Sequence, residues 1–186
     1  MPPKQVETIR DEILYQYAKV IAKSAFGQSS KRAGFGFILK TFLELRDGTK
    51  KWSEITREDK QFLQTERECI YCGSTEDLQF DHIVPKSIRI KDACVSCDKL
   101  QGIHNQIYAC SRCNQEKGKI GLYAFFQKKL PNDRYYYDKI PSLLEKKYLK
   151  TIYSCHECAG SLSKNTFEGG RKVLALDIDS VLGFQV

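Results

Sequence analysis

Four cysteines in two Cys-x-x-Cys pairs, Cys69/Cys72 and Cys110/Cys113, bracket a polar stretch in the middle of the chain. Paired thiolates at this spacing are typical ligands of a tetrahedral zinc ion. Four thiolates leave no open coordination position, so the ion would not activate water itself. It would instead clamp two segments that are too small to be held together by a hydrophobic core alone. We therefore predict a structural zinc site bound by these four residues.

The residues between these two pairs carry the side chains that hydrolysis of a phosphodiester bond requires. Asp81 and His82 adjoin each other, and Asn105 and Asn114 follow. A neutral imidazole can take a proton from an attacking water near pH 7. Carboxylate and amide oxygens are ligands for a hard cation such as Mg²⁺ or Mn²⁺, and such a cation neutralises charge at the phosphate and stabilises the departing oxygen. The stretch therefore indicates metal-dependent cleavage of a nucleic-acid backbone.

In this order the motifs resemble the HNH (ββα-metal) endonuclease family over roughly residues 69–120. The resemblance implies that His82 is the general base and that Asp81 and Asn114 are the protein ligands of the catalytic cation. It also implies that Asn105 fixes the backbone of the loop that carries the histidine. Each motif is common by itself, whereas the joint pattern is specific.

The other four cysteines also form two Cys-x-x-Cys pairs, Cys94/Cys97 and Cys155/Cys158. The first of these pairs lies in an insertion between the histidine and the central asparagine that is longer than in compact members of the family. The first zinc already has four ligands, so we expect the two remaining pairs to bind a second structural zinc. A metal shared between two chains is the alternative. The expected cofactors are thus two Zn²⁺ ions and one Mg²⁺ or Mn²⁺ ion.

The formal net charge of +7 favours an acidic partner such as nucleic acid, but only weakly. Two four-thiolate zinc sites, each with a net charge of about −2, would lower it to about +3. Basic side chains near the motif are the candidate contacts to phosphate groups, with a solvated surface position as the alternative for each: Lys86, Arg89, Arg112 and Lys117. No apolar stretch of spanning length and no signal-peptide pattern is present, so we expect a cytoplasmic protein with no membrane partner.

Hydrophobic periodicity and turn residues predict an α+β fold in three regions. Residues 1–68 form an α-helical N-terminal region for DNA binding or dimerisation. Residues 69–130 form a small zinc-bound ββα-metal nuclease core, and residues 131–186 form a C-terminal region with the second four-cysteine zinc knuckle module. We expect helices over 5–26, 35–46, 57–67, 114–130 and 142–150, strands over 78–85 and 106–109, and a further strand at 173–179 in the tail.

These features favour a divalent-metal-dependent HNH DNA endonuclease that hydrolyses phosphodiester bonds. A prokaryotic restriction or defence nuclease is the preferred subtype, and a homing or mobile-element nuclease is the alternative within the class. A non-catalytic zinc-knuckle protein that binds nucleic acid is the alternative from another class. Double-stranded DNA is the expected partner. By resemblance to HNH restriction enzymes, a homodimer is expected where both strands are cut.

Overall fold

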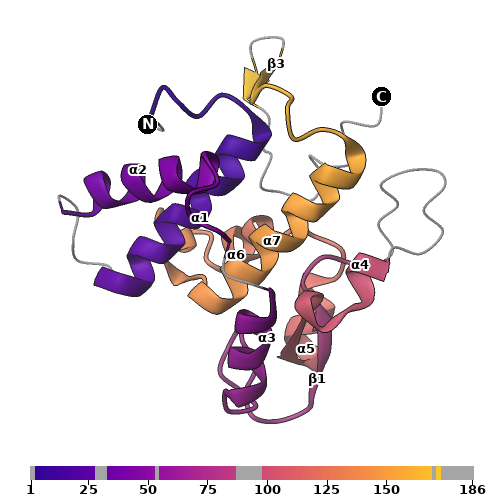
Figure 1. Cartoon of the computed structure of the whole chain (residues 1–186). Helices are drawn as coiled ribbons and strands as arrows, with labels where there is room; N and C mark the ends of the chain where they lie inside the picture. Colours follow the sequence, from indigo (N-terminus) through magenta and orange to yellow (C-terminus); the bar gives the residue numbers. More distant parts are fainter. Residues whose placement is uncertain (1–2, 28–32, 53–54, 87–97, 169–170, 173–186) are drawn as a thin grey trace.

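The computed structural model describes residues 3–27, 33–52, 55–86, 98–168 and 171–172, and within them the fold is α+β. Helix α7 (Ser142–Ala159) contacts helices α1 (Ile9–Phe26) and α3 (Ile55–Gln64), and it runs between the α1–α2 pair and the small β1–β2 sheet (Figure 1). The other elements are helices α2 (Ala33–Arg46), α4 (Asp98–Gln101), α5 (Ser111–Lys117) and α6 (Leu122–Lys129), the 3-10 turns η1 (Ile103–Asn105) and η2 (Tyr136–Lys139), and strands β1 (Leu78–His82), β2 (Gln106–Cys110), β3 (Phe167–Glu168) and β4 (Arg171–Lys172).

Helix α1 begins at a capping box. Thr8 Oγ1 accepts a hydrogen bond from the backbone N–H of Asp11, and the Asp11 carboxylate accepts one from the backbone N–H of Thr8. These bonds satisfy donors that the first helical turn leaves without partners. Gly27, with a φ of 68°, ends the helix. The predicted helix over 5–26 is therefore confirmed except for its first residues. Its buried face holds apolar residues at helical spacing, among them Ile9, Ile13, Leu14, Tyr17 and Val20.

Helix α7 is longer than the sequence predicted. The expected helix ended at residue 150 before a zinc knuckle, whereas the observed helix continues through Cys155 and Cys158. Its buried face continues without interruption through Tyr148, Ile152 and Cys155. The helix itself contains no glycine or proline. Gly160, which has left-handed backbone angles, forms its C-cap. The two cysteines thus lie three positions apart on one side of a helix.

Strands β1 and β2 form the antiparallel pair that the sequence predicted. Asp81 lies opposite Ile107, and His82 lies opposite Gln106. Successive side chains of a strand point to opposite faces of a sheet. Phe80 and His82 therefore share one face, and Asp81 lies on the other face, against helix α5.

The single helix predicted over 114–130 is wrong, because two helices occupy this stretch. Helix α5 ends at Lys117, and Gly118 follows with a φ of 50°, in the left-handed region that favours glycine. Gly121 then caps helix α6. The chain turns between the two helices, so that α5 packs against β1 and β2 while α6 contacts η2.

The chain after α7 returns to the beginning of α1. The backbone N–H groups of Ile9 and Arg10 donate to the carbonyls of Lys164 and Leu162. These hydrogen bonds hold the segment after α7 against the start of α1. The tail strand predicted at 173–179 lies outside the described residues. Among the residues that the structure describes, no helix has the length and the apolar composition needed to cross a membrane.

Candidate active site

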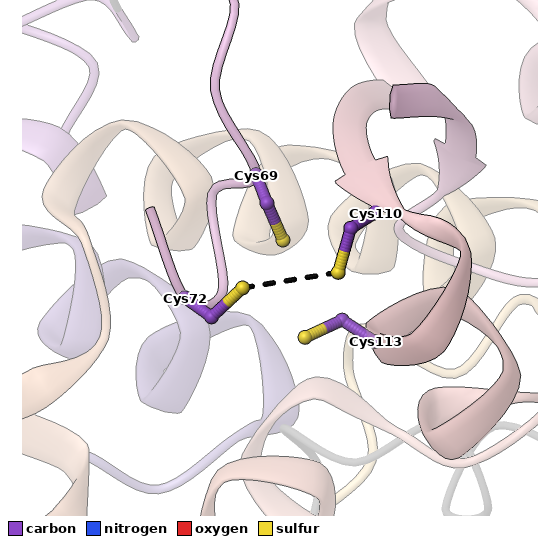
Figure 2. Close-up of side chains that lie close together, drawn as sticks. All are labelled: Cys69, Cys72, Cys110 and Cys113. Carbon is purple, nitrogen blue, oxygen red and sulfur yellow. Dashed lines mark hydrogen bonds between the residues drawn. The ribbon is translucent and has the colours of Figure 1, made fainter. Parts of the chain in front are cut away.

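The four cysteines of the first predicted zinc site come together beside the β1–β2 pair. Cys69 and Cys72 lie in the loop before β1, Cys110 ends β2, and Cys113 lies in α5. Figure 2 shows their side chains pointing toward one another, and the four sulfur atoms lie within 4.8 Å of one another. The Sγ atoms of Cys72 and Cys110 are 3.8 Å apart. Tetrahedral zinc with bonds of about 2.3 Å places sulfur atoms about 3.8 Å apart, so the cluster is compatible with one zinc ion.

Burial and polar neighbours act in opposite directions on these thiols. A hydrogen bond from the backbone of Ser74 lowers the pKa of Cys72 to about 7. Burial raises the pKa of Cys113 to about 12, although the Nζ atom of Lys129 lies 3.3 Å from its sulfur. A bound zinc ion stabilises thiolates. Zinc binding and deprotonation of the buried thiol would therefore occur together.

Asn105 lies where the resemblance placed the central asparagine, and its side chain is completely buried. Its Oδ1 atom accepts a 2.8 Å hydrogen bond from the backbone N–H of Val84. Its Nδ2 atom donates to the carbonyls of Val84, at 2.7 Å, and Leu100, at 2.8 Å. The Asn105 carbonyl also accepts a bond from the backbone N–H of Ile83. These contacts hold the two residues that follow His82 in one conformation.

Asp81 is buried between the zinc loop and helix α5. The Tyr71 hydroxyl donates a 2.8 Å hydrogen bond to its Oδ2 atom, and the Nζ atom of Lys117 lies 3.4 Å from the same oxygen. Burial raises the pKa of Tyr71, and the Asp81 charge raises it further. Burial lowers the pKa of Lys117, and Asp81 opposes that effect. A carboxylate offers about four acceptor positions, so Asp81 keeps the capacity to bind a cation as well.

Lys117 is buried, so the prediction that it contacts a DNA phosphate is wrong. A contact to DNA needs an exposed ammonium group, but the Lys117 side chain is 0% exposed. Its Nζ atom donates a 2.9 Å hydrogen bond to the carbonyl of His82 in addition to its contact with Asp81. Residues four apart share one side of a helix, so Lys117 points inward with Cys113 of the cysteine cluster. That spacing was the signal in the sequence for its burial.

His82 is half-buried on the opposite face of the sheet from Asp81. Its Nε2 atom lies 3.5 Å from the Nε2 atom of Gln106, the residue opposite it on β2. Burial is the main cause of its lowered pKa, and the positive charges of Lys86 and Lys117 lower the pKa further while Asp81 raises it. The imidazole is therefore neutral near pH 7, the form that can accept a proton.

Asn114 is half-buried on α5, three residues before Lys117 and hence on the same side of the helix. The Asn114 amide oxygen and the Asp81 carboxylate are the kinds of ligand that Mg²⁺ and Mn²⁺ prefer. The residues therefore fit a hard cation in chemical type. Tyr71 and Gln106 were not among the predicted site residues, because nothing in their sequence positions indicates contact with Asp81 and His82.

The other predicted phosphate contacts lie at the surface where the structure describes them. Lys86 and Arg112 are exposed, and Arg112 forms a 3.9 Å ion pair with Glu116 on the same helix. Arg89 lies outside the described residues. Surface ion pairs of this kind contribute little to stability, so the pair does not prevent Arg112 from contacting a phosphate group.

The second predicted zinc site stays a prediction. Cys94 and Cys97 lie outside the described residues. Cys155 is buried in α7, and Cys158, one turn later, is half-buried. Thiolates three residues apart on a helix lie on the same side of it, so this pair has a spacing that suits one metal ion.

The segment that holds these residues is a β-hairpin joined to a short helix by a cluster of four cysteines, with an aspartate–histidine pair on the first strand. This segment matches the model of the HNH endonuclease family over residues 69–119. The match includes the cysteine cluster, Asp81, His82, Asn105 and Asn114. No curated protein and no solved structure matches the chain.

Proposed function

We propose that this protein is a divalent-metal-dependent endonuclease that hydrolyses phosphodiester bonds in double-stranded DNA. The observation that carries the proposal is the set of contacts around the end of β1, within the segment that matches the HNH family. Asn105 fixes the backbone that follows His82, and Lys117 binds both Asp81 and the His82 carbonyl. A buried polar network of this kind specifies one arrangement of its members.

In this proposal His82 takes a proton from the water that attacks the phosphorus atom. Its ring is half-exposed at the end of β1, so a water can reach it. Asp81 and Asn114 would hold Mg²⁺ or Mn²⁺. When bound, that cation neutralises charge on the phosphate and stabilises the departing 3′ oxygen. Tyr71 and Lys117 orient the Asp81 carboxylate.

Plasmid cleavage by the zinc-loaded protein tests the proposal. Supercoiled plasmid should be nicked or linearised with Mg²⁺ or Mn²⁺ and should stay intact when neither ion is added. His82→Ala should lower the rate by about 10²- to 10⁴-fold, the usual contribution of a general base. His104→Ala is the matched control, because His104 has no part in the proposed chemistry. Zinc content and far-UV circular dichroism should be unchanged in both variants.

Two results would refute this assignment of function. Cleavage by His82→Ala at the rate of the wild-type protein would exclude His82 as the base. DNA binding without metal-dependent cleavage by the wild-type protein would favour the non-catalytic zinc-knuckle protein instead.

The biological role that we propose is restriction or defence in the cytoplasm of a prokaryotic cell. Residues outside the matched segment provide enough surface to contact DNA beyond the cut site, and homing is the alternative role. Sequencing the ends that the enzyme produces from genomic DNA separates the two. A short recurring sequence at the ends would support restriction, and one long sequence would support homing.

A further inference from the structure

A row of aromatic rings next to His82 has no part in the chemistry described above. Phe80 of β1 packs against Tyr108 of β2, with ring centroids 4.9 Å apart and an angle of 28° between the planes. Tyr108 packs against Phe62 of α3, with a centroid distance of 5.0 Å and an angle of 32°. Phe62 is buried, whereas Phe80 is 53% exposed. The row of rings therefore begins in the core and ends at the surface.

Two cations lie over this row. The Nζ atom of Lys147 is 4.4 Å from the centroid of Phe62, and the guanidinium carbon of Arg67 is 5.7 Å from the centroid of Tyr108. The negative face of an aromatic ring attracts such cations. Arg67 is exposed, so it places positive charge at the surface over Tyr108, the ring next to Phe80. That charge is complementary to a phosphate backbone.

The exposed ring lies on the same face of the sheet as the proposed general base. Phe80 and His82 are two residues apart on β1, and their partners on β2 are Tyr108 and Gln106. Two residues of a strand span about 6.7 Å, so Phe80 lies within one or two nucleotides of a phosphate held at His82, whether the strand is stacked at about 3.4 Å per nucleotide or more extended. A substrate with its scissile phosphate at His82 would therefore place a base one or two nucleotides away at Phe80.

We propose that Phe80 stacks with an unstacked nucleobase of the substrate, next to the scissile phosphate. This inference rests on the proposed function and adds a requirement on the substrate: the base must be single-stranded or extruded from the duplex. A base fits the exposed ring because it is flat and extends a row of near-parallel rings, while its phosphate meets Arg67. Stacking of this kind tolerates all four bases, so it would favour an open strand without reading its sequence.

An abasic scan combined with a ring variant tests the contact. The cut is mapped on an end-labelled oligonucleotide, and each nearby nucleotide is replaced in turn by an abasic residue. For the wild-type protein, one abasic position should lower kcat/KM by roughly 5- to 150-fold. Phe80→Ala should show the same loss on the intact substrate and no further loss at that position, because two partners of one contact are not additive.

Phe35→Ala is the matched control, because Phe35 is 52% exposed and lies on α2. It should retain the wild-type response to abasic residues. Zinc content and circular dichroism show whether Phe80→Ala folds. If it folds poorly, Phe80→Leu, which keeps apolar packing against Tyr108, replaces it in the abasic scan. Wild-type cleavage by Phe80→Ala, or an unchanged abasic penalty in that variant, would refute stacking. Conversion of a dimer to a monomer by Phe80→Ala, with the abasic penalty unchanged, would instead assign the ring to a contact between two copies.

A binding measurement separates failure of this inference from failure of the proposed function. Zinc-loaded Phe80→Trp is titrated with an oligonucleotide without added Mg²⁺ or Mn²⁺, while anisotropy of a label on the oligonucleotide reports binding. Trp52, the chain's one native tryptophan, packs against Tyr17 and Tyr153 and provides the background signal. Quenching of the new tryptophan supports stacking even if the wild-type protein cuts nothing, a result that would refute only the nuclease. Binding without quenching refutes stacking and leaves the nuclease intact.

Discussion

Replacement of Asn105 by alanine should destabilise the protein and reduce its activity together. The side chain has no exposed surface, so no water takes over its hydrogen bonds when it is removed. The substitution leaves the N–H and the carbonyl of Val84 and the carbonyl of Leu100 without the partner that they have in the native structure. These groups belong to the segments that surround the loop after His82.

The expected magnitude follows from the three hydrogen bonds. Each contributes about 0.5–1.5 kcal/mol net, and each buried polar group left unpaired costs about 1–3 kcal/mol. We expect Asn105→Ala to lower the free energy of unfolding by about 3–5 kcal/mol. Asn105→Asp tests the donor half of the interaction separately. It retains an oxygen that can accept from Val84, but it places the second carboxylate oxygen against two carbonyl oxygens, so it should destabilise at least as much.

Urea unfolding of the zinc-loaded proteins, followed by circular dichroism, measures this effect. Asn132→Ala is the matched control, because Asn132 is exposed, and it should change the free energy of unfolding by less than about 0.5 kcal/mol. In the cleavage assay Asn105→Ala should lower kcat more than it changes KM, since it disturbs the position of His82. If both Asn105 variants lower the free energy of unfolding by less than about 1 kcal/mol, the three hydrogen bonds do not hold the loop.

Three further predictions concern other buried or metal-binding groups. Lys117→Met should destabilise the protein by about 3 kcal/mol because it leaves a buried carboxylate unpaired, whereas Lys119→Met, at an exposed position, should have little effect; equal unfolding midpoints would contradict this. Elemental analysis should find two zinc ions per chain and one in Cys94→Ser/Cys97→Ser, and a wild-type value of one would exclude the second site. Burial raises the pKa of Glu145 above its ordinary value of 4.5, so the wild-type protein loses stability as the pH rises from that value through the raised pKa. The Glu145→Gln variant should lack this loss, and a stability difference between the two proteins that stays constant from pH 4 to pH 9 would disprove the assignment.

The hairpin and the first cysteine cluster could be predicted because short-range rules determine them. A Cys-x-x-Cys spacing brings two thiolates to one ion wherever it occurs, and two such pairs on either side of a strand pair leave few arrangements. The position of Asn105 directly before β2 likewise follows from its place in the motif. Helix α1 could be predicted from its apolar spacing, and Thr8 and Asp11 form the cap that fixes its start.

The parts that could not be predicted depend on contacts between distant segments. The spacing of Lys117 from Cys113 indicates which side of α5 it occupies, but a lysine is usually exposed, and its contact with Asp81, 36 residues earlier in the chain, is what makes its burial favourable. Tyr71 adopts its role for the same reason. Helix α7 extends past residue 150 because its buried face packs against α1 and α3 and no glycine or proline ends it before Gly160; the expected end came from interpreting Cys155 and Cys158 as a knuckle outside the helix.

Helix α5 explains why a zinc ligand, a candidate cation ligand and a buried lysine occur within five consecutive residues. A helix of seven residues is not stable in water by itself. The cysteine cluster includes Cys113 in its first turn, and Lys117 binds β1 from its last turn. Asn114 lies between these two contacts, on the helix that packs against β1. A zinc ion at the cysteine cluster, together with the buried ion pair, would therefore do in this short segment what a hydrophobic core does in a larger one: both would set the geometry on which the proposed chemistry depends.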